Sequence, residues 1–174
     1  PAHDIFIYDL NRDSKDDSEN DYVDVLAVNK GLVIATESDW FEEDGYKGGN
    51  YVWLYDLASG GIWYYAHQRK VYVVENQLVE QGDKIGEVGR TGFNAKTNRS
   101  DTHLHLMYLK IDDNLNPKPI DHYPWLKKAR TAYQAALPTH YPRKELSANR
   151  IVNKPPRPLK TAFNLELARK PFLN

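Results

Sequence analysis

Thr102-His103-Leu104-His105-Leu106 is the stretch from which the fold of this chain can be predicted. In a helix, two histidines one residue apart point in different directions. In a strand, alternate side chains leave the same face, so His103 and His105 would project side by side. Residues 102–111 alternate and contain no Gly or Pro, which predicts a strand. Two such imidazoles can bind a metal, or divide the roles of ligand and base, or lie hydrogen-bonded in a core.

The composition limits the possible chemistry. The 174 residues suit one domain with an appendage, and no apolar run approaches the length of a membrane span. Cysteine is absent, which excludes disulfides and thiolate metal sites, so a metal has to be held by His, Asp or Glu. No signal peptide is recognised, and the chain opens at Pro1 rather than Met, so the sequence itself says little about targeting.

The net charge of −1 conceals an asymmetry between the two ends of the chain. Residues 1–60 carry 4 basic and 14 acidic side chains, whereas residues 114–174 carry 12 basic and 3 acidic ones. The basic tail could meet an anionic envelope surface, or one half could cover the other, or the tail could be solvated without a partner. No nucleic-acid partner is expected.

Short alternating segments separated by turn residues continue up to residue 111. We expect strands at residues 4–8, 23–28, 31–35, 50–56, 62–67, 71–74, 79–88 and 102–111. This pattern predicts an all-β fold, an antiparallel sandwich or a barrel-like groove. On the strand at 62–67, Trp63, Tyr65 and His67 are expected to share one face, with His67 accessible at the end of the strand.

The acidic loop at residues 9–21 has part of a calcium-binding pattern. Asp9, Asn11 and Asp13 have the first three ligand spacings, but the loop lacks the turn glycine at the sixth position and the glutamate at the twelfth. A solvated acidic loop is the favoured interpretation, and calcium binding stays open.

The sequence changes character after residue 112. Residues 114–119 are expected to form a linker, and periodic apolar residues predict a helix over about 124–137, with Pro124 in its first turn. The remainder is rich in proline and basic residues and is expected to be irregular. We therefore expect a β domain at 1–112 and a C-terminal linker, helix and basic extension at 113–174.

Four motifs occur in order over about residues 1–110. They are Asp4-Ile5-Phe6-Ile7, then Tyr65-Ala66-His67 after Gly49-Asn50-Tyr51-Val52, then the stretch 79–92, and finally Thr102-His103-Leu104-His105. Together they resemble the LytM/lysostaphin-type zinc metallopeptidases, which have the duplicated-hybrid-motif fold.

The resemblance implies one zinc ion bound by Asp4 and His105. It also implies that His103 is the general base and that His67 acts on the oxyanion side or as an auxiliary group, roles that the sequence does not separate. The family's third ligand lies four residues before the aspartate, just before Pro1 and outside this sequence. His3 is a less favoured substitute, because a neighbour of Asp4 in an extended segment should point to the opposite face.

The resemblance also suggests residues that contact the substrate, namely Asn50 and Tyr65. The family often has a tyrosine just ahead of the Gly-Asn pair, where this chain has Gly48. Tyr46 and Tyr65 are therefore candidates for holding the oxyanion, although packing is the favoured interpretation of each.

The function implied by the resemblance is hydrolysis of peptide cross-links in bacterial peptidoglycan, in the periplasm or outside the cell. The alternative is a catalytically inactive module of the same fold that binds and activates cell-wall amidases. The retention of Asp4, His67, His103 and His105 favours the enzyme. A biotinyl or lipoyl carrier domain, which residues 79–92 also resemble, is disfavoured because no lysine lies at a tight hairpin tip.

Overall fold

The computed structural model describes residues 1–44, 47–96 and 100–136, and for residues 130–136 it describes the backbone alone. The elements are β1 (Ala2–Phe6), β2 (Lys15–Asp16), β3 (Asp21–Tyr22), β4 (Asp24–Leu26), β5 (Gly31–Glu37), the 3-10 helix η1 (Glu42–Asp44), β6 (Asn50–Asp56), β7 (Ile62–Val71), β8 (Leu78–Val79), β9 (Lys84–Val88), β10 (His103–Ile111), β11 (Pro117–Ile120) and α1 (Tyr123–Ala136).

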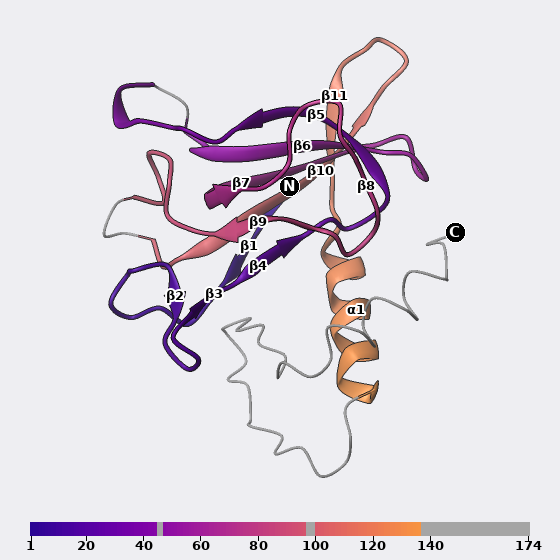
Figure 1. The fold of residues 1–174 in the computed structure, drawn as a ribbon. Coiled ribbons are helices and arrows are strands. Elements are labelled where there is room, and N and C mark those ends of the chain that lie inside the picture. The colour runs from indigo at the N-terminus through magenta and orange to yellow at the C-terminus, as the bar shows by residue number, and fades with distance from the viewer. Residues whose placement is uncertain (45–46, 97–99, 137–174) are drawn as a thin grey trace.

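Nine strands form one antiparallel sheet, as the all-β expectation requires. Its main order is β1-β10-β7-β6-β5-β8, with β11 added to β10, and β9 joining β7 to β4. In Figure 1, β5, β6, β7 and β10 lie side by side, and β4 and β9 run below them at an angle. The sheet is open, so the fold is not a closed barrel. The described residues contain no helix that is long and apolar enough to cross a membrane.

The core lies on one face of this sheet, where alternate residues of the central strands are buried. On β7 and β10 these are Trp63, Tyr65, Leu104, Leu106 and Tyr108, each no more than 8% exposed. Burying such aromatic and aliphatic side chains is the main term that stabilises a domain of this size.

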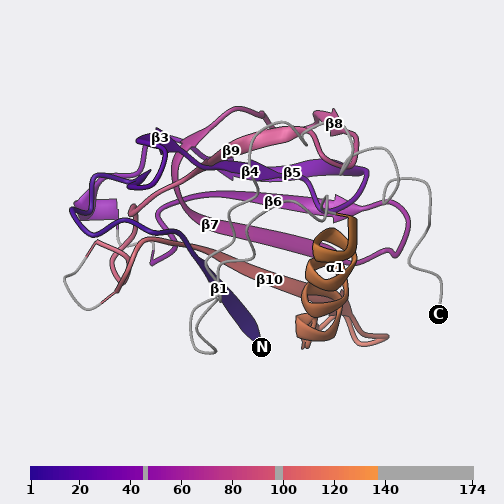
Figure 2. The same ribbon diagram turned by 90° about the horizontal axis from the view of Figure 1, so that it is seen from below.

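Helix α1 forms close to where the sequence predicts it, and it covers one side of this core (Figure 2). The ring of Trp125 lies 5.3 Å from that of Tyr108 and 6.1 Å from that of Trp63, measured between centroids. Leu126 also packs against the core. The helix therefore belongs to the β domain by contact, although the sequence places it in a separate segment.

The expected linker at 114–119 differs from the structure. Pro117–Ile120 form β11, which pairs with Tyr108–Ile111 of β10. Prolines are compatible with an edge strand because one side of such a strand makes no ladder hydrogen bonds. The proline-rich basic extension lies outside the described residues.

The acidic loop is organised by Asp9, which is 7% exposed. Its carboxylate accepts hydrogen bonds from the backbone N–H of Asp13 and Ser14 and from the hydroxyl of Thr102. Asp9, the first ligand position of the calcium-binding pattern, therefore already receives its hydrogen bonds from the protein itself.

Candidate active site

The pairing of β1 with β10 brings a carboxylate to the two histidines. Asp4 is the register partner of His105, and Phe6 is the partner of His103. Asp4 Oδ1 lies 2.9 Å from His105 Nδ1 and 3.7 Å from His103 Nε2. The strand alternation expected for His103 and His105 is thus present, and the neighbouring strand contributes Asp4 to the same face.

His67 lies at a discontinuity in β7. Ala66 pairs with His105 of β10, whereas Gln68 pairs with Val88 of β9, so the strand changes partners at the residue between them. His67 has a φ of 63°, in the left-handed region that non-glycine residues rarely adopt. Irregularities of this kind redirect a side chain, and they concentrate at functional sites.

This discontinuity corrects the expectation that Trp63, Tyr65 and His67 share one face. Trp63 and Tyr65 are 2% and 0% exposed in the core. His67 instead faces the cavity together with Tyr64 and Ala66. The alternation therefore holds as far as Ala66 and is broken by the positive φ at His67.

Two loops cross closely beside His67. Gly49 and Gly92 both have positive φ, and a Cβ at Gly92 would lie 2.5 Å from the carbonyl oxygen of Lys47. Only glycine permits this approach of two backbones. The crossing brings the carbonyl oxygen of Thr91 to 2.9 Å from His67 Nδ1.

Backbone carbonyls determine which nitrogen of each catalytic candidate carries the proton. Because a carbonyl can only accept, His67 Nδ1 donates to Thr91 O, and His103 Nδ1 donates to Asp101 O at 2.7 Å. Nε2 of each neutral ring is then left as a proton acceptor. One ligand atom from each of His67, His103 and His105 lies within 4.8 Å of the others.

The surroundings favour a neutral His67 ring beside an ionised Asp4 carboxylate. Burial and the neighbouring His103 lower the pKa of His67 to about 4. The hydrogen bond from His105 and the charge of His103 lower the pKa of Asp4. At neutral pH the site therefore contains an anionic oxygen and an imidazole that can take up a proton.

These groups line a cavity of about 320 Å³. Its walls are Asp4, Lys47, Gly48, Tyr64, Ala66, His67, Asn94, Ser100, His103 and His105. Tyr64 has no counterpart among the residues singled out from the sequence. Burial raises the pKa of Tyr64 to about 12, so its hydroxyl is protonated at neutral pH.

Several candidates from the sequence lie elsewhere. Tyr65 is fully buried, and its hydroxyl accepts from the backbone N–H of Val28. Asn50 is 4% exposed and its side-chain oxygen accepts from the backbone N–H of Trp40, so it ties two loops together. His3 contacts Asp121 through Nε2, away from the cavity. Tyr46 lies outside the described residues.

The donor set fits a zinc ion. Imidazole nitrogen and carboxylate oxygen are the ligands that zinc takes when thiolates are absent. His67 and His103 have their Nδ1 protons held by backbone carbonyls, a common way of orienting histidines around a metal. The Asp4–His105 pair and the two further histidines thus lie together on one face of the sheet, where such atoms can serve as metal ligands or as bases.

The fold and the site together define a metallohydrolase-like β domain. The model of peptidase family M23 matches residues 16–117, more than half of the chain, and the chain belongs to this family. The match includes His67, His103 and His105 and begins after Asp4. No curated protein sequence matches the chain significantly.

One solved structure with a TM-score above 0.5 agrees on the fold, and two further ones are similar to the chain. A LytM protein from Ruminococcus gnavus, assigned as a glycyl-glycine endopeptidase, is 22% identical with a TM-score of 0.53, over 76% of this chain and 55% of that one. Lysostaphin from Staphylococcus simulans is 23% identical with a TM-score of 0.49, over 72% of this chain and 47% of that one. LytU is 19% identical with a TM-score of 0.48, over 62% of this chain. The chain spans 66% of LytU and about half of the other two.

Proposed function

We propose that this chain is a zinc-dependent endopeptidase that hydrolyses peptide bonds in the cross-links of bacterial peptidoglycan. The observation that carries the proposal is the convergence of Asp4, His67, His103 and His105 on one cavity. Membership of a peptidase family supports the reaction class. The substrate class rests on the resemblance of the four sequence motifs to LytM/lysostaphin-type enzymes.

Asp4 and His105 would hold the zinc ion, with the third ligand expected upstream of Pro1. When bound, zinc supplies Lewis acidity and lowers the pKa of water toward neutrality. His103, oriented by Asp101 O, accepts the proton of the attacking water at Nε2 and delivers it to the leaving amine. His67, whose Nδ1 proton is held by Thr91 O, presents a second Nε2 acceptor beside His103 and serves as the auxiliary group.

The conformation of His67 favours an enzyme over an inactive regulatory module. A non-glycine residue with a φ of 63° costs of order 1–3 kcal/mol, and such strain persists where the surrounding structure enforces it. Here the loop crossing at Gly49 and Gly92 enforces it and also supplies the hydrogen bond from His67 to Thr91. A module that binds partners through a vacant groove has no need for this arrangement. The proposed substrate places the protein in the cell envelope, periplasmic or extracellular.

The test combines metal analysis with a digest of purified peptidoglycan. Zinc content is measured on this chain and, where the natural protein continues upstream of Pro1, on the longer form. New amino termini released from peptidoglycan are then counted for the wild type, the chelated protein, the protein resupplied with zinc, and His103→Ala. We expect zinc-dependent release that His103→Ala abolishes. A protein that neither binds zinc nor cuts, yet stimulates a wall amidase, would be the regulatory module instead.

A further inference from the structure

Tyr64 directs its hydroxyl at the backbone of Gly48, on the wall of the cavity. A Cβ added at residue 48 would lie 1.9 Å from the Tyr64 hydroxyl oxygen, so any other residue would displace that oxygen. Both residues line the same cavity as Asp4 and His103. The absence of a side chain at residue 48 is therefore what allows the phenol to lie beside the metal-binding groups.

The ring of Tyr64 is fixed by its neighbours on the sheet. Trp53 is its register partner on β6, and the two rings lie 4.3 Å apart with an interplanar angle of 30°. Tyr51 packs against it at 5.8 Å, and His105 lies edge-on at 6.2 Å. A hydrogen-bond donor held this rigidly loses little conformational entropy when it binds a ligand.

Several other donors on the cavity wall are engaged or charged. His67 donates its Nδ1 proton to Thr91 O, and the Ser100 hydroxyl contacts His103 and Asp101 O. Lys47 has an exposed side chain that carries a full positive charge. The Tyr64 hydroxyl makes no hydrogen bond to the part of the chain that the structure describes, so it is a neutral donor available to a bound molecule.

We propose that Tyr64 donates a hydrogen bond to the carbonyl oxygen of the scissile peptide as that oxygen becomes negative. This role rests on the proposed peptidase function. The water oxygen bonds to the carbonyl carbon, and the π electron pair moves to the carbonyl oxygen. The oxyanion pair then re-forms the C=O bond as the C–N bond breaks, and the amine nitrogen takes the proton that His103 accepted from the attacking water. Tyr64 keeps its own proton throughout, so it stabilises the oxyanion without entering the proton balance.

The test compares Tyr64→Phe with Tyr51→Phe, which removes a hydroxyl from the adjacent ring outside the cavity. We expect Tyr64→Phe to lower kcat about 100-fold, the typical effect of deleting one oxyanion donor, with KM and zinc content unchanged. Tyr51→Phe should stay within about twofold of the wild type. A phosphinic peptide, which mimics the tetrahedral intermediate, should lose affinity for Tyr64→Phe by the same factor as kcat/KM, whereas the cleavage products should not.

A second variant moves the hydroxyl instead of deleting it. Gly48→Ala should displace the Tyr64 hydroxyl and lower kcat, and the double variant Gly48→Ala/Tyr64→Phe should be no slower than Tyr64→Phe alone, because both act on one hydrogen bond. A wild type that cuts peptidoglycan while Tyr64→Phe keeps its kcat would overturn the role of Tyr64. The same holds if Tyr46→Phe shows the loss instead. A wild type with no zinc-dependent cutting would overturn the peptidase function first, and this role with it.

Discussion

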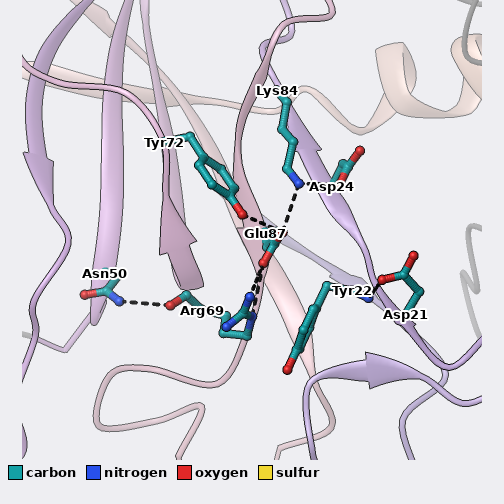
Figure 3. A network of polar contacts seen from close by, with 8 residues as sticks. All are labelled: Asp21, Tyr22, Asp24, Asn50, Arg69, Tyr72, Lys84 and Glu87. Carbon is teal, nitrogen blue, oxygen red and sulfur yellow. Dashed lines mark hydrogen bonds and ion pairs between the residues drawn. The ribbon is translucent and has the colours of Figure 1, made fainter.

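The histidine cavity and the cluster around Glu87 are both built on β7, and they treat charge in opposite ways. Arg69, two residues after His67, lies 2.5 Å from Glu87 through Nη2. Lys84 Nζ and the Tyr72 hydroxyl donate to the other oxygen of Glu87 at 2.9 and 2.7 Å. Figure 3 shows these side chains converging on one carboxylate. Every oxygen of Glu87 is satisfied by the protein itself.

In the cavity, by contrast, His105 Nδ1 donates to Asp4, and the imidazoles of His67 and His103 lie beside this pair. Asp4 and three histidines offer lone pairs, and the described residues place only Lys47 there as a cation. The Glu87 cluster is complete and fastens β9 to β7, whereas under the proposed function the histidine cluster is completed by a metal ion. The difference teaches that neutralisation within the chain, not the mere gathering of ionisable groups, separates a structural cluster from a binding site.

The largest expected effect comes from removing a ligand from the cavity. His105→Ala should lose zinc and lower kcat/KM about 1000-fold or more, because the metal supplies the attacking nucleophile. The fold should survive, since the side chain of His105 is 31% exposed. Zinc content, activity and thermal unfolding are the measurements. His3→Gln, one residue from Asp4, is the matched control and should keep its zinc. A loss of zinc in His3→Gln would contradict the confinement of metal binding to the cavity.

The next effect tests the other cluster. Glu87→Gln should lower the free energy of unfolding by about 3 kcal/mol, because Arg69 and Lys84 lose the anion that they share. Zinc affinity should change little. The control is Glu80→Gln at the exposed ion pair with Lys30, which should cost less than about 0.5 kcal/mol. Denaturant unfolding of the wild type, Glu87→Gln and Glu80→Gln measures the difference. If both variants lost the same free energy of unfolding, Glu87 would contribute no more to stability than a surface carboxylate.

Much of this site could be predicted from local periodicity. The alternation of residues 102–111 placed His103 and His105 on one face, and the structure has them there. It also indicated that His3 and Asp4 point to opposite faces, which the contact of His3 with Asp121 bears out. These inferences depend only on the strand period of two, which a regular strand obeys whatever its partners.

The positions of His67 and Tyr64 could not be predicted in this way. The φ of 63° at His67 occurs beside the crossing of two loops some forty residues apart, at Gly49 and Gly92. Once that residue breaks the alternation, Tyr65 belongs to the core and Tyr64 to the cavity, the reverse of the expectation. The Tyr-Tyr pair gives no local signal, because either residue suits a half-buried strand.

A third buried group, His122, can be compared with both clusters, because it lacks partners like those of Glu87 and does not line the histidine cavity. It is 0% exposed, and its ring nitrogens have no hydrogen-bond partner among the described residues. Burial and the charge of neighbouring His3 lower the pKa of His122 from 6.5 to about 4.

The unfolded chain therefore takes up the proton at a higher pH than the folded one. The free energy of unfolding should fall by about 2 kcal/mol as the pH drops from 6.5 through 4. His122→Phe should remove this part of the slope, and His67 cancels from the difference because both proteins carry it. Unfolding at pH 7, 5.5 and 4 measures the effect, and parallel slopes for the two proteins would contradict it.

The smallest effect concerns Thr102, which directly precedes His103 and is hydrogen-bonded to the acidic loop. Its hydroxyl donates to Asp9 at 2.6 Å and accepts from Arg90 at 2.9 Å. This contact resembles the Glu87 cluster in being internally satisfied, yet it lies beside the catalytic candidates.

Thr102→Val keeps the side-chain shape and should cost about 1 kcal/mol of unfolding free energy. Ser38→Ala, which removes an exposed hydroxyl next to Asp39, should cost almost nothing. If Thr102→Val also lowered kcat more than tenfold at unchanged zinc content, the contact would serve to position His103. Thr102 would then contribute both to stability, as Glu87 does, and to the catalytic site.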